Sequence, residues 1–420
     1  MKLLGFKIIR ALFGFLFTVG LLSSTSCSHK FNNPVLPKIF LPPAIPSNPS
    51  PPDKATNQPV SLTLSWTCTD PNPSEVLTYD VRLKTFTDTL PMNQALSSPN
   101  CVISGLSPNT TYLWQVIARN TKGQTTQGHL WEFSTGVWSQ KGSLPTPRMY
   151  LAAGVTNGRL YAIGGWNGGA YLPAVVMYDP ITDQWFKRAS LTTPRAYLAV
   201  GALAFKLYAL GGWDGTGPSS VVEEYDPLAD TWVFKRSMPT PRHGLAAGVV
   251  NGKIYAIGGY NTTGGYLATV EEYDPATDTW SSKASMPTAR CMLTVGVLNN
   301  KIYAVGGQNG AVPLSTVEEY DPSTNTWTSK APMPTPRAYL AAEIVNGKLY
   351  ALGGWCGSPL SAVEEYDPGA NAWIQKTSML TGRLGLAAGE MDQKIYAIGG
   401  GDTQGQAYSV VEEYDPLLDP

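Results

Sequence analysis

Six arginines recur at nearly equal intervals through the last two-thirds of the chain, and their spacing gives them the clearest capacity for chemistry. They are Arg148, Arg195, Arg242, Arg290, Arg337 and Arg383. A guanidinium group donates hydrogen bonds in a fixed fork that fits a carboxylate with two contacts. If these side chains share one surface, they form a pocket for an anionic ligand, either an acidic peptide or an acidic sugar.

Aromatic residues accompany the arginines at two fixed positions. Tyrosines stand two residues after three of the arginines, at Tyr150, Tyr197 and Tyr339. Large aromatic residues directly follow four glycine pairs, at Trp166, Trp213, Tyr260 and Trp355. Flat rings offer a large contact area at low entropic cost to a peptide or to the face of a sugar. We therefore predict that these residues bind the ligand together with the arginines.

The same period organises the elements that must position these residues. Glycine pairs begin at Gly164, Gly211, Gly258, Gly306, Gly353 and Gly399, and the triplet Tyr-Asp-Pro starts at Tyr178, Tyr225, Tyr273, Tyr320, Tyr366 and Tyr414. Within the third unit the pattern predicts four short strands: A over 245–250, B over 253–257 after an Asn-Gly turn, C over 269–273 and D from Trp280 onward. Six four-stranded units predict a six-bladed β-propeller.

The tryptophans predict how the ring of blades closes. In the first five units a tryptophan follows the tyrosine of the triplet by seven residues, at Trp185, Trp232, Trp280, Trp327 and Trp373. After Tyr414 the same position falls beyond residue 420, whereas Trp138 stands ahead of the first unit in the sequence WSQKGSLPTPR, which matches WSSKASMPTAR at Trp280. We therefore predict that residues 137–145 supply the last strand of the last blade, which removes two exposed sheet edges.

Residues 137–420 resemble the kelch repeat. The resemblance rests on the paired glycines after strand B, the sequence Val-Glu-Glu-Tyr-Asp-Pro, the tryptophan about seven residues later and the sequence Met-Pro-Thr-Pro-Arg. It implies a propeller and says little about function, because kelch propellers serve as binding scaffolds and, less often, as enzymes.

Strand direction predicts which face of the propeller is functional. Antiparallel strands place the B–C loops and the D–A connections on one face, and the short A–B and C–D turns on the other. The B–C loops differ among units in length and content, whereas the turns barely differ. Since varying loops on a fixed scaffold are free to serve a ligand, we expect binding on the B–C/D–A face.

The arginines also have a structural interpretation. Five units carry two consecutive glutamates in strand C, and a guanidinium group could pair with one of them inside the fold. These glutamates are Glu223, Glu224, Glu271, Glu272, Glu318, Glu319, Glu364, Glu365, Glu412 and Glu413. In the first unit Val176 and Met177 replace both glutamates. If the arginines exist to form such pairs, Arg148 or a neighbour is released for another role.

Residues for catalysis are sparse. His243 is the one histidine after residue 137, so neither a Ser-His-Asp arrangement nor the two-histidine copper site of kelch-type oxidases fits this region. We expect no metal and no cofactor. Three carboxylates remain as candidate acids or bases: Asp214, Asp402 and Glu343. Glu343 stands where strand A of the other units has glycine, and it is either a ligand-binding residue or the solvated lining of an axial channel.

The first 27 residues resemble the signal peptide of a bacterial lipoprotein. Basic residues precede an apolar run over 11–22, and small residues lead to Cys27. The resemblance implies export, lipidation of Cys27 and attachment to the bacterial outer membrane or cell surface by the lipid anchor alone. An ordinary signal peptide, and hence a periplasmic or secreted protein, is the alternative. Residues 28–43 predict a proline-rich linker that extends to about residue 52.

Residues 44–136 follow a different pattern, with alternating strands and without the propeller period. The sequence LSPNTTY over 106–112 resembles the tyrosine corner of a β-sandwich, with Trp66 before it and Trp114 after it. This stretch resembles a fibronectin type III domain. The resemblance implies a spacer or an adhesion module.

The cysteines allow two disulfides. Cys68 and Cys101 fall on strands that are expected to be neighbours, and an oxidising compartment permits a bond between them; two buried thiols are the alternative. Cys291 and Cys356 share the variable face of the propeller, where they form either a rim disulfide or two separate thiols.

Composition limits the partners. The 420 residues, of which 43% are hydrophobic, suffice for two cores, and a net charge of −1 with 15% charged residues provides no basic surface for nucleic acid. The sequence thus predicts an all-β chain: a six-bladed kelch propeller over 137–420, preceded by a fibronectin type III-like sandwich over 44–136. We expect an exported, non-catalytic protein that binds a protein or glycan ligand. The alternative is an acidic-sugar mutarotase of the sialic acid type, or another carbohydrate-active enzyme, which requires an arginine-lined pocket with a carboxylate.

Overall fold

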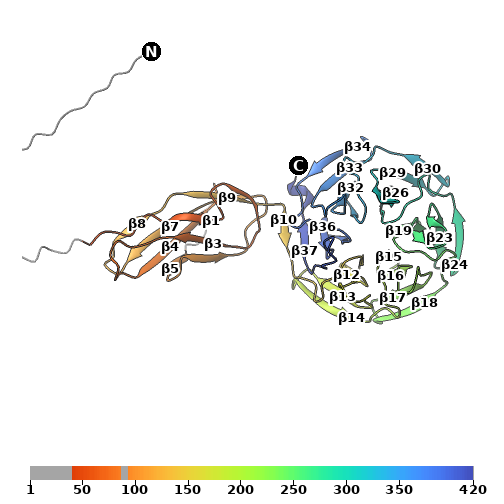
Figure 1. Cartoon of the computed structure of the whole chain (residues 1–420), viewed down its shortest axis with the longest axis horizontal. Coiled ribbons are helices and arrows are strands. Elements are labelled where there is room, and N and C mark those ends of the chain that lie inside the picture. Colours follow the sequence, from red (N-terminus) through yellow and green to blue (C-terminus); the bar gives the residue numbers. More distant parts are fainter. Residues whose placement is uncertain (1–39, 87–92, 420) are drawn as a thin grey trace, which may run out of the picture. The chain divides into compact units, whose positions relative to one another are not determined.

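The computed structural model describes residues 40–86 and 93–419, and the chain is all-β as predicted (Figure 1). Within these residues the helical structure is one 3-10 turn, η1 (Pro416–Leu418), and no helix is long and apolar enough to cross a membrane. The predicted signal sequence, Cys27 and the first part of the proline-rich linker lie outside the described residues.

Six four-stranded antiparallel sheets, called blades 1 to 6 here, form a closed ring in which each innermost strand lies beside the next (Figure 1). Blade 1 contains β11 (Ala152–Thr156), β12 (Arg159–Ile163), β13 (Val175–Asp179) and β14 (Gln184–Arg188). Blade 2 contains β15 (Ala199–Leu203), β16 (Lys206–Leu210), β17 (Val222–Asp226) and β18 (Thr231–Lys235). Blade 3 contains β19 (Ala246–Val250), β20 (Lys253–Ile257), β23 (Val270–Asp274) and β24 (Thr279–Lys283).

The remaining blades repeat this arrangement. Blade 4 contains β25 (Thr294–Leu298), β26 (Lys301–Val305), β29 (Val317–Asp321) and β30 (Thr326–Ser329). Blade 5 contains β31 (Ala341–Val345), β32 (Lys348–Leu352), β33 (Val363–Asp367) and β34 (Ala372–Lys376). Blade 6 contains β35 (Ala387–Met391), β36 (Lys394–Ile398), β37 (Val411–Tyr414) and β10 (Trp138–Gln140). Short hairpins add β21 (Tyr260–Asn261) with β22 (Gly265–Tyr266), and β27 (Gln308–Asn309) with β28 (Val312–Pro313), in the B–C loops of blades 3 and 4.

The ring is closed by a strand from the start of the propeller sequence. In blade 6 the strand order is β10-β37-β36-β35, and Trp138 lies directly opposite Tyr414. The two rings stack with centroids 4.7 Å apart, and the indole Nε1 of Trp138 donates to the carbonyl oxygen of Thr377 in blade 5 at 2.9 Å. This pairing confirms the partner that the tryptophan spacing predicts for Tyr414.

The tryptophans join each blade to the one before it. In blades 1 to 5 the indole Nε1 likewise donates to a backbone carbonyl oxygen at 2.7–2.9 Å, which the preceding D–A connection supplies. The donor residues are Trp185, Trp232, Trp280, Trp327 and Trp373. Aliphatic and tyrosine side chains of neighbouring blades fill the spaces between the sheets. These contacts hold the B–C loops and D–A connections in a fixed frame.

The N-terminal domain is a β-sandwich. One sheet has the order β1 (Ser47–Ser50), β3 (Leu62–Thr67) and β6 (Asn100–Ile103). The other has the order β2 (Ala55–Gln58), β9 (Trp131–Thr135), β7 (Thr111–Asn120), β4 (Leu77–Lys84) and β5 (Asn93–Leu96), with β8 (Thr125–Gln127) paired to β7.

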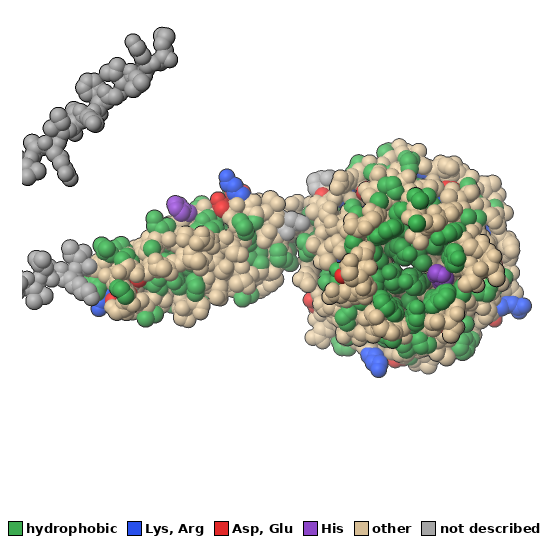
Figure 2. Space-filling model, in the orientation of Figure 1, with side chains coloured by type: hydrophobic (Ala, Val, Ile, Leu, Met, Phe, Trp, Pro, Cys, Tyr) green, Lys and Arg blue, Asp and Glu red, His purple; other side chains and the backbone are tan. Residues whose placement is uncertain are grey.

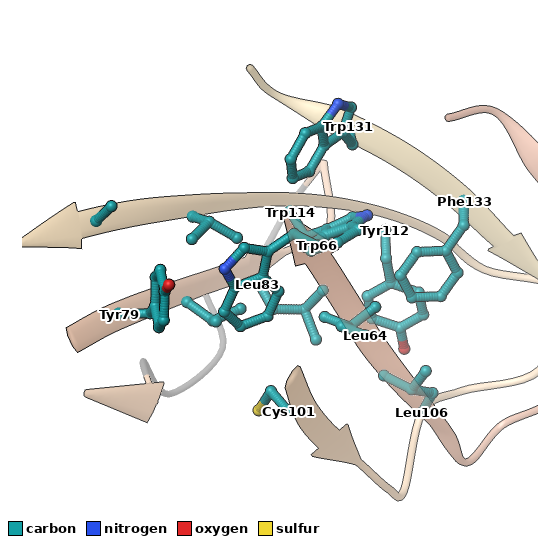
Figure 3. Close-up of a cluster of buried hydrophobic side chains, with 13 residues drawn as sticks. Leu64, Trp66, Tyr79, Leu83, Cys101, Leu106, Tyr112, Trp114, Trp131 and Phe133 are labelled. Atoms are coloured by element: carbon teal, nitrogen blue, oxygen red, sulfur yellow. The ribbon is translucent and has the colours of Figure 1, made fainter. Parts of the chain in front are cut away.

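Aromatic side chains fill the space between the two sheets of the sandwich. Trp66 and Trp114 lie side by side in the core, and Trp131 packs against Trp114 with ring centroids 4.8 Å apart (Figure 3). The backbone N–H of Ser107 donates to the hydroxyl of Tyr112 at 2.8 Å. This bond is the tyrosine corner that the sequence predicts.

The predicted disulfide between Cys68 and Cys101 is not formed, since both residues are thiols in the structure. Cys101 lies opposite Leu64 in the antiparallel register, so Cys68 falls four residues further along its strand. At about 3.4 Å per residue, this offset separates the two cysteines by about 14 Å along the sheet, whereas a disulfide needs Cα atoms within about 7 Å. The thiol of Cys68 instead donates to the carbonyl oxygen of Ala44 at 3.2 Å.

Candidate functional site

The B–C/D–A face of the propeller contains a cavity of about 560 Å³. Residues from blades 1, 4, 5 and 6 and from the D–A connections line it: Tyr150, Trp166, Tyr171, Tyr197, Gln308, Ala311, Tyr339, Trp355, Leu384, Asp402, Thr403, Gln404 and Gly405. Hydrophobic side chains gather around the centre of the propeller (Figure 2). The lining contains six aromatic residues, one carboxylate and no lysine or arginine. We refer to it as the aromatic cavity.

Five of the seven aromatic residues predicted to bind ligand line this cavity, namely Tyr150, Tyr197, Tyr339, Trp166 and Trp355. Sequence reasoning missed Tyr171, which lies in the variable B–C loop of blade 1, and Gln308. Gln308 occupies the same repeat position as the two tryptophans, immediately after a glycine pair, and this shared position was the available signal.

The other two predicted aromatic residues, Trp213 and Tyr260, do not line the aromatic cavity. Their rings pack against His243, with centroids 5.2 Å and 5.6 Å from the imidazole. Burial lowers the pKa of His243 below its ordinary value, and its Nδ1 atom is buried without a hydrogen-bond partner. Within this cluster the imidazole is therefore neutral at physiological pH and acts as a packing residue.

Six residues around the propeller axis share a left-handed backbone conformation. They stand two positions after the arginines and are Tyr150, Tyr197, Gly244, Met292, Tyr339 and Gly385, with φ between 52° and 62°. The N–H of each donates to the carbonyl oxygen of the residue one blade earlier at 2.7–2.9 Å, so the six bonds form a closed circle. The circle fixes the backbone from which the three tyrosines reach the aromatic cavity, where the rings of Tyr150 and Tyr197 stack with centroids 4.1 Å apart.

A left-handed conformation is unfavourable for tyrosine by about 1–2 kcal/mol, and glycine adopts it without this penalty at two positions of the same circle. Backbone strain of this kind is found at functional sites, where the side chain serves a purpose other than stability. Met292 adopts the same conformation without lining the aromatic cavity, so the circle of hydrogen bonds imposes it at this position of every repeat.

At position 339, glycine is expected to be better tolerated than alanine. Both variants lose the aromatic ring, but Tyr339→Ala keeps the strained φ of 57°. Tyr339→Gly should therefore be more stable by about 1 kcal/mol, measured by urea unfolding. The matched control is Ser281, an exposed residue of strand β24 without a left-handed backbone, where alanine should be more stable than glycine. Equal stability of the two variants at position 339 contradicts the expectation.

The six predicted arginines do not line the cavity, because their side chains are buried with at most 1% of their surface exposed. Five of them form buried ion pairs at 2.6–3.0 Å: Arg195–Glu223, Arg242–Glu271, Arg290–Glu318, Arg337–Glu364 and Arg383–Glu412. The guanidinium groups also donate to backbone carbonyl oxygens of strands B and C and of the residues beside them, as Arg195 does to Gly211 and Val221 at 2.8 Å. The structure thus supports the structural interpretation of these six arginines, none of which lines the aromatic cavity.

The three candidate carboxylates do not converge on one site. Asp402 lines the aromatic cavity, but its Oδ1 accepts from the N–H groups of Gln404 and Gln406, both at 2.9 Å, and so shapes its own loop. Asp214 accepts in the same way from Thr216 and Gly217 in blade 2.

Glu343 lies apart from the aromatic cavity, in a cavity of about 210 Å³ that the innermost strands line. Burial and the nearby Glu390 raise the pKa of Glu343 to about 8. The innermost strands therefore surround Glu343, away from the aromatic residues of the site. Within residues 40–86 and 93–419, no group of three or more histidine, cysteine or acidic side chains is arranged to hold a metal ion.

Family models match both the propeller and the N-terminal domain. The KLHDC2/KLHL20/DRC7 Kelch-repeats domain matches residues 104–284 and 206–400, the Kelch motif matches residues 382–419, and the fibronectin type III domain matches residues 47–130. No curated protein matches the chain. The solved structure of YjhT is similar, with a TM-score of 0.57 and 18% identity over 64% of this chain and 95% of that chain, a likeness that shows the fold. The chain therefore belongs to the kelch-repeat family, with a fibronectin type III domain ahead of its propeller.

Proposed function

We propose that the propeller is a non-catalytic binding module that takes a neutral carbohydrate ring into the aromatic cavity. The observation that carries this proposal is the convergence of six aromatic side chains in a lining without lysine or arginine. The volume of about 560 Å³ falls within the range of roughly 300–1,000 Å³ that is typical of small-molecule sites. Pyranose C–H faces pack against flat rings, and Gln308, Asp402 and Gln404 offer polar atoms to sugar hydroxyls.

An acidic sugar is disfavoured by charge. The guanidinium groups that would neutralise its carboxylate are buried in ion pairs, and the one ionisable carboxylate of the cavity lining, Asp402, repels another anion. The mutarotase alternative also requires a carboxylate acid or base beside the sugar. The Oδ1 of Asp402 already accepts from two backbone N–H groups, which hold this carboxylate within its own loop, and Glu343 lies in a different cavity.

We further propose that the protein is exported and attached to the bacterial outer membrane or cell surface through a lipid on Cys27. The support is the basic start, the apolar run and the small residues before Cys27. In this arrangement the fibronectin type III domain serves as a spacer that carries the propeller away from the membrane.

The binding proposal is tested by titrating the protein with neutral oligosaccharides, sialylated oligosaccharides and peptides in a calorimeter. Replacing Trp166 and Trp355 together by alanine should weaken binding of the neutral sugar by at least about 30-fold, because the loss of even one aromatic residue at the centre of a binding site costs about 2 kcal/mol or more. The matched control replaces Trp213 and Tyr260, which occupy the same repeat position but pack on His243. The control should bind as the unmodified protein does.

Three results contradict the proposal. They are equal loss of binding in both double variants, binding of sialylated sugars or peptides in preference to neutral sugars, and acceleration of anomer exchange of a reducing sugar in NMR exchange spectra. The last result identifies an enzyme.

A further inference from the structure

Blade 1 lacks the buried carboxylate that the other five blades place beside their arginine. Val176 pairs with Ala162 of strand β12, as Glu223 pairs with Ala209 of strand β16 in blade 2. The two positions are therefore equivalent, and the hydrophobic Val176 stands where a glutamate accepts the charge of the arginine in the other blades.

Arg148 nevertheless adopts the same buried arrangement as its counterparts. It is 1% exposed, and its Nη1 donates to the carbonyl oxygens of Gly164 at 3.2 Å and Ala174 at 2.9 Å. The equivalent nitrogen of Arg337 donates to Gly353 and Ala362, which leaves the Nη2 of Arg337 for Glu364 at 2.7 Å. Across the residues that the structure describes, no carboxylate lies within 4.0 Å of the Arg148 guanidinium.

In three other blades the glutamate that pairs with the arginine also accepts a hydrogen bond from a threonine hydroxyl. In blades 3, 4 and 5 a threonine two residues before the arginine donates its hydroxyl to the glutamate at 2.6–2.7 Å; the pairs are Thr240–Glu271, Thr288–Glu318 and Thr335–Glu364. Thr146 is the counterpart in blade 1. Arg148 and Thr146 thus retain the donors of a carboxylate site in the one blade where valine replaces the glutamate.

A buried cation without a counter-charge is strongly unfavourable. Burial lowers the pKa of Arg148 to about 10, so the guanidinium stays charged at neutral pH. Valine is shorter than glutamate by the carboxyl end of the side chain, which is the part that meets the arginine in the other blades. A small anion at this place restores both the charge balance and the two hydrogen bonds.

We propose that blade 1 binds a small monovalent anion of the size of chloride between the guanidinium of Arg148 and the hydroxyl of Thr146. The anion takes the place of the glutamate carboxylate and stabilises the propeller. This site is separate from the aromatic cavity, so its test is independent of the sugar-binding proposal.

The first experiment compares thermal unfolding in sodium chloride and in sodium gluconate at equal ionic strength. Chloride should raise the melting temperature of the unmodified protein by a few degrees in a saturable way, because a ligand that binds the folded state stabilises it by mass action. Val176→Glu supplies the carboxylate within the chain, and it should melt at the same temperature in both salts. Arg195→Met in blade 2 leaves the proposed site intact and should keep the response to chloride.

Two outcomes of this experiment overturn the proposal: equal melting temperatures of the unmodified protein in the two salts, or an unchanged response to chloride in Val176→Glu. If Val176→Glu does not fold, the proposal can still be tested by crystallography of the unmodified protein. Crystals soaked in sodium bromide should give an anomalous-difference peak within hydrogen-bond distance of both the Arg148 guanidinium and the Thr146 hydroxyl. An empty map at this position also overturns the proposal.

Discussion

Arg195→Met is expected to destabilise the propeller by about 3–5 kcal/mol, the usual cost of removing one partner from a buried ion pair. Arg195 and Glu223 are both fully buried, with Nη2 and Oε1 2.9 Å apart. Without Arg195, the carboxylate of Glu223 keeps one short bond, from the N–H of Thr192 at 2.8 Å, and its charge has no counterpart. The measurement is urea unfolding at neutral pH.

Arg148→Met is the matched control for this prediction. Arg148 is equally buried, but its removal leaves no buried carboxylate behind, so the variant should lose clearly less stability in chloride-free buffer. The double variant Arg195→Met with Glu223→Leu should recover part of the loss, because it removes both charges. An Arg148→Met variant that is at least as unstable as Arg195→Met contradicts a role for these arginines as partners of the glutamates.

Trp138→Ala is expected to lower the free energy of unfolding by about 3–5 kcal/mol, the usual loss when a fully buried aromatic residue is truncated to alanine. The side chain of Trp138 has 0% exposure, stacks on Tyr414 and donates to Thr377 of the neighbouring blade. It also belongs to the strand that joins the two ends of the propeller sequence. Its loss weakens the closure of the ring as well as the core, and chemical unfolding followed by tryptophan fluorescence and circular dichroism measures the effect.

The control for Trp138 is Trp280→Ala in blade 3. Trp280 occupies the same repeat position and donates to the carbonyl oxygen of Arg236 at 2.8 Å, but its side chain is partly exposed and its strand follows directly from β23 in the same blade. This variant should lose less stability and should unfold in one transition with the rest of the propeller. Equal losses in the two variants would show that the closing strand has no special importance.

Much of the fold follows from local features of the sequence. Glycine pairs and Tyr-Asp-Pro triplets mark strand ends in every unit, and Asn-Gly turns separate strands A and B in the first, third and fifth units. The tryptophan ahead of the first unit predicts the partner of Tyr414, because each unit needs one indole at one position. The turn signals depend on residues that are near one another in the chain, and the closure signal depends on counting one tryptophan per unit. Neither requires knowledge of the direction in which a side chain points.

The candidate site was predictable in location but not in chemistry. Antiparallel strands determine on which face the B–C loops lie, so Trp166, Trp355 and the tyrosines could be assigned to one face. The same spacing is compatible with arginines that point into a pocket and with arginines that point into the fold. The structure decides between the two, since burial and ion pairs with strand C turn the guanidinium groups away from the cavity.

Local sequence signals suffice for the repeat, the four strands of each unit, the face of the variable loops and the loss of the strand C glutamates in blade 1. The folded arrangement alone shows that Trp166 and Trp355 line a cavity while Trp213 and Tyr260 pack on His243, and that Cys68 and Cys101 are offset along the sheet. The physical reason is that spacing along the chain fixes hydrogen-bonded backbone structure. The surroundings of a side chain depend instead on strand register and on loops from other blades, which come together only in the folded protein.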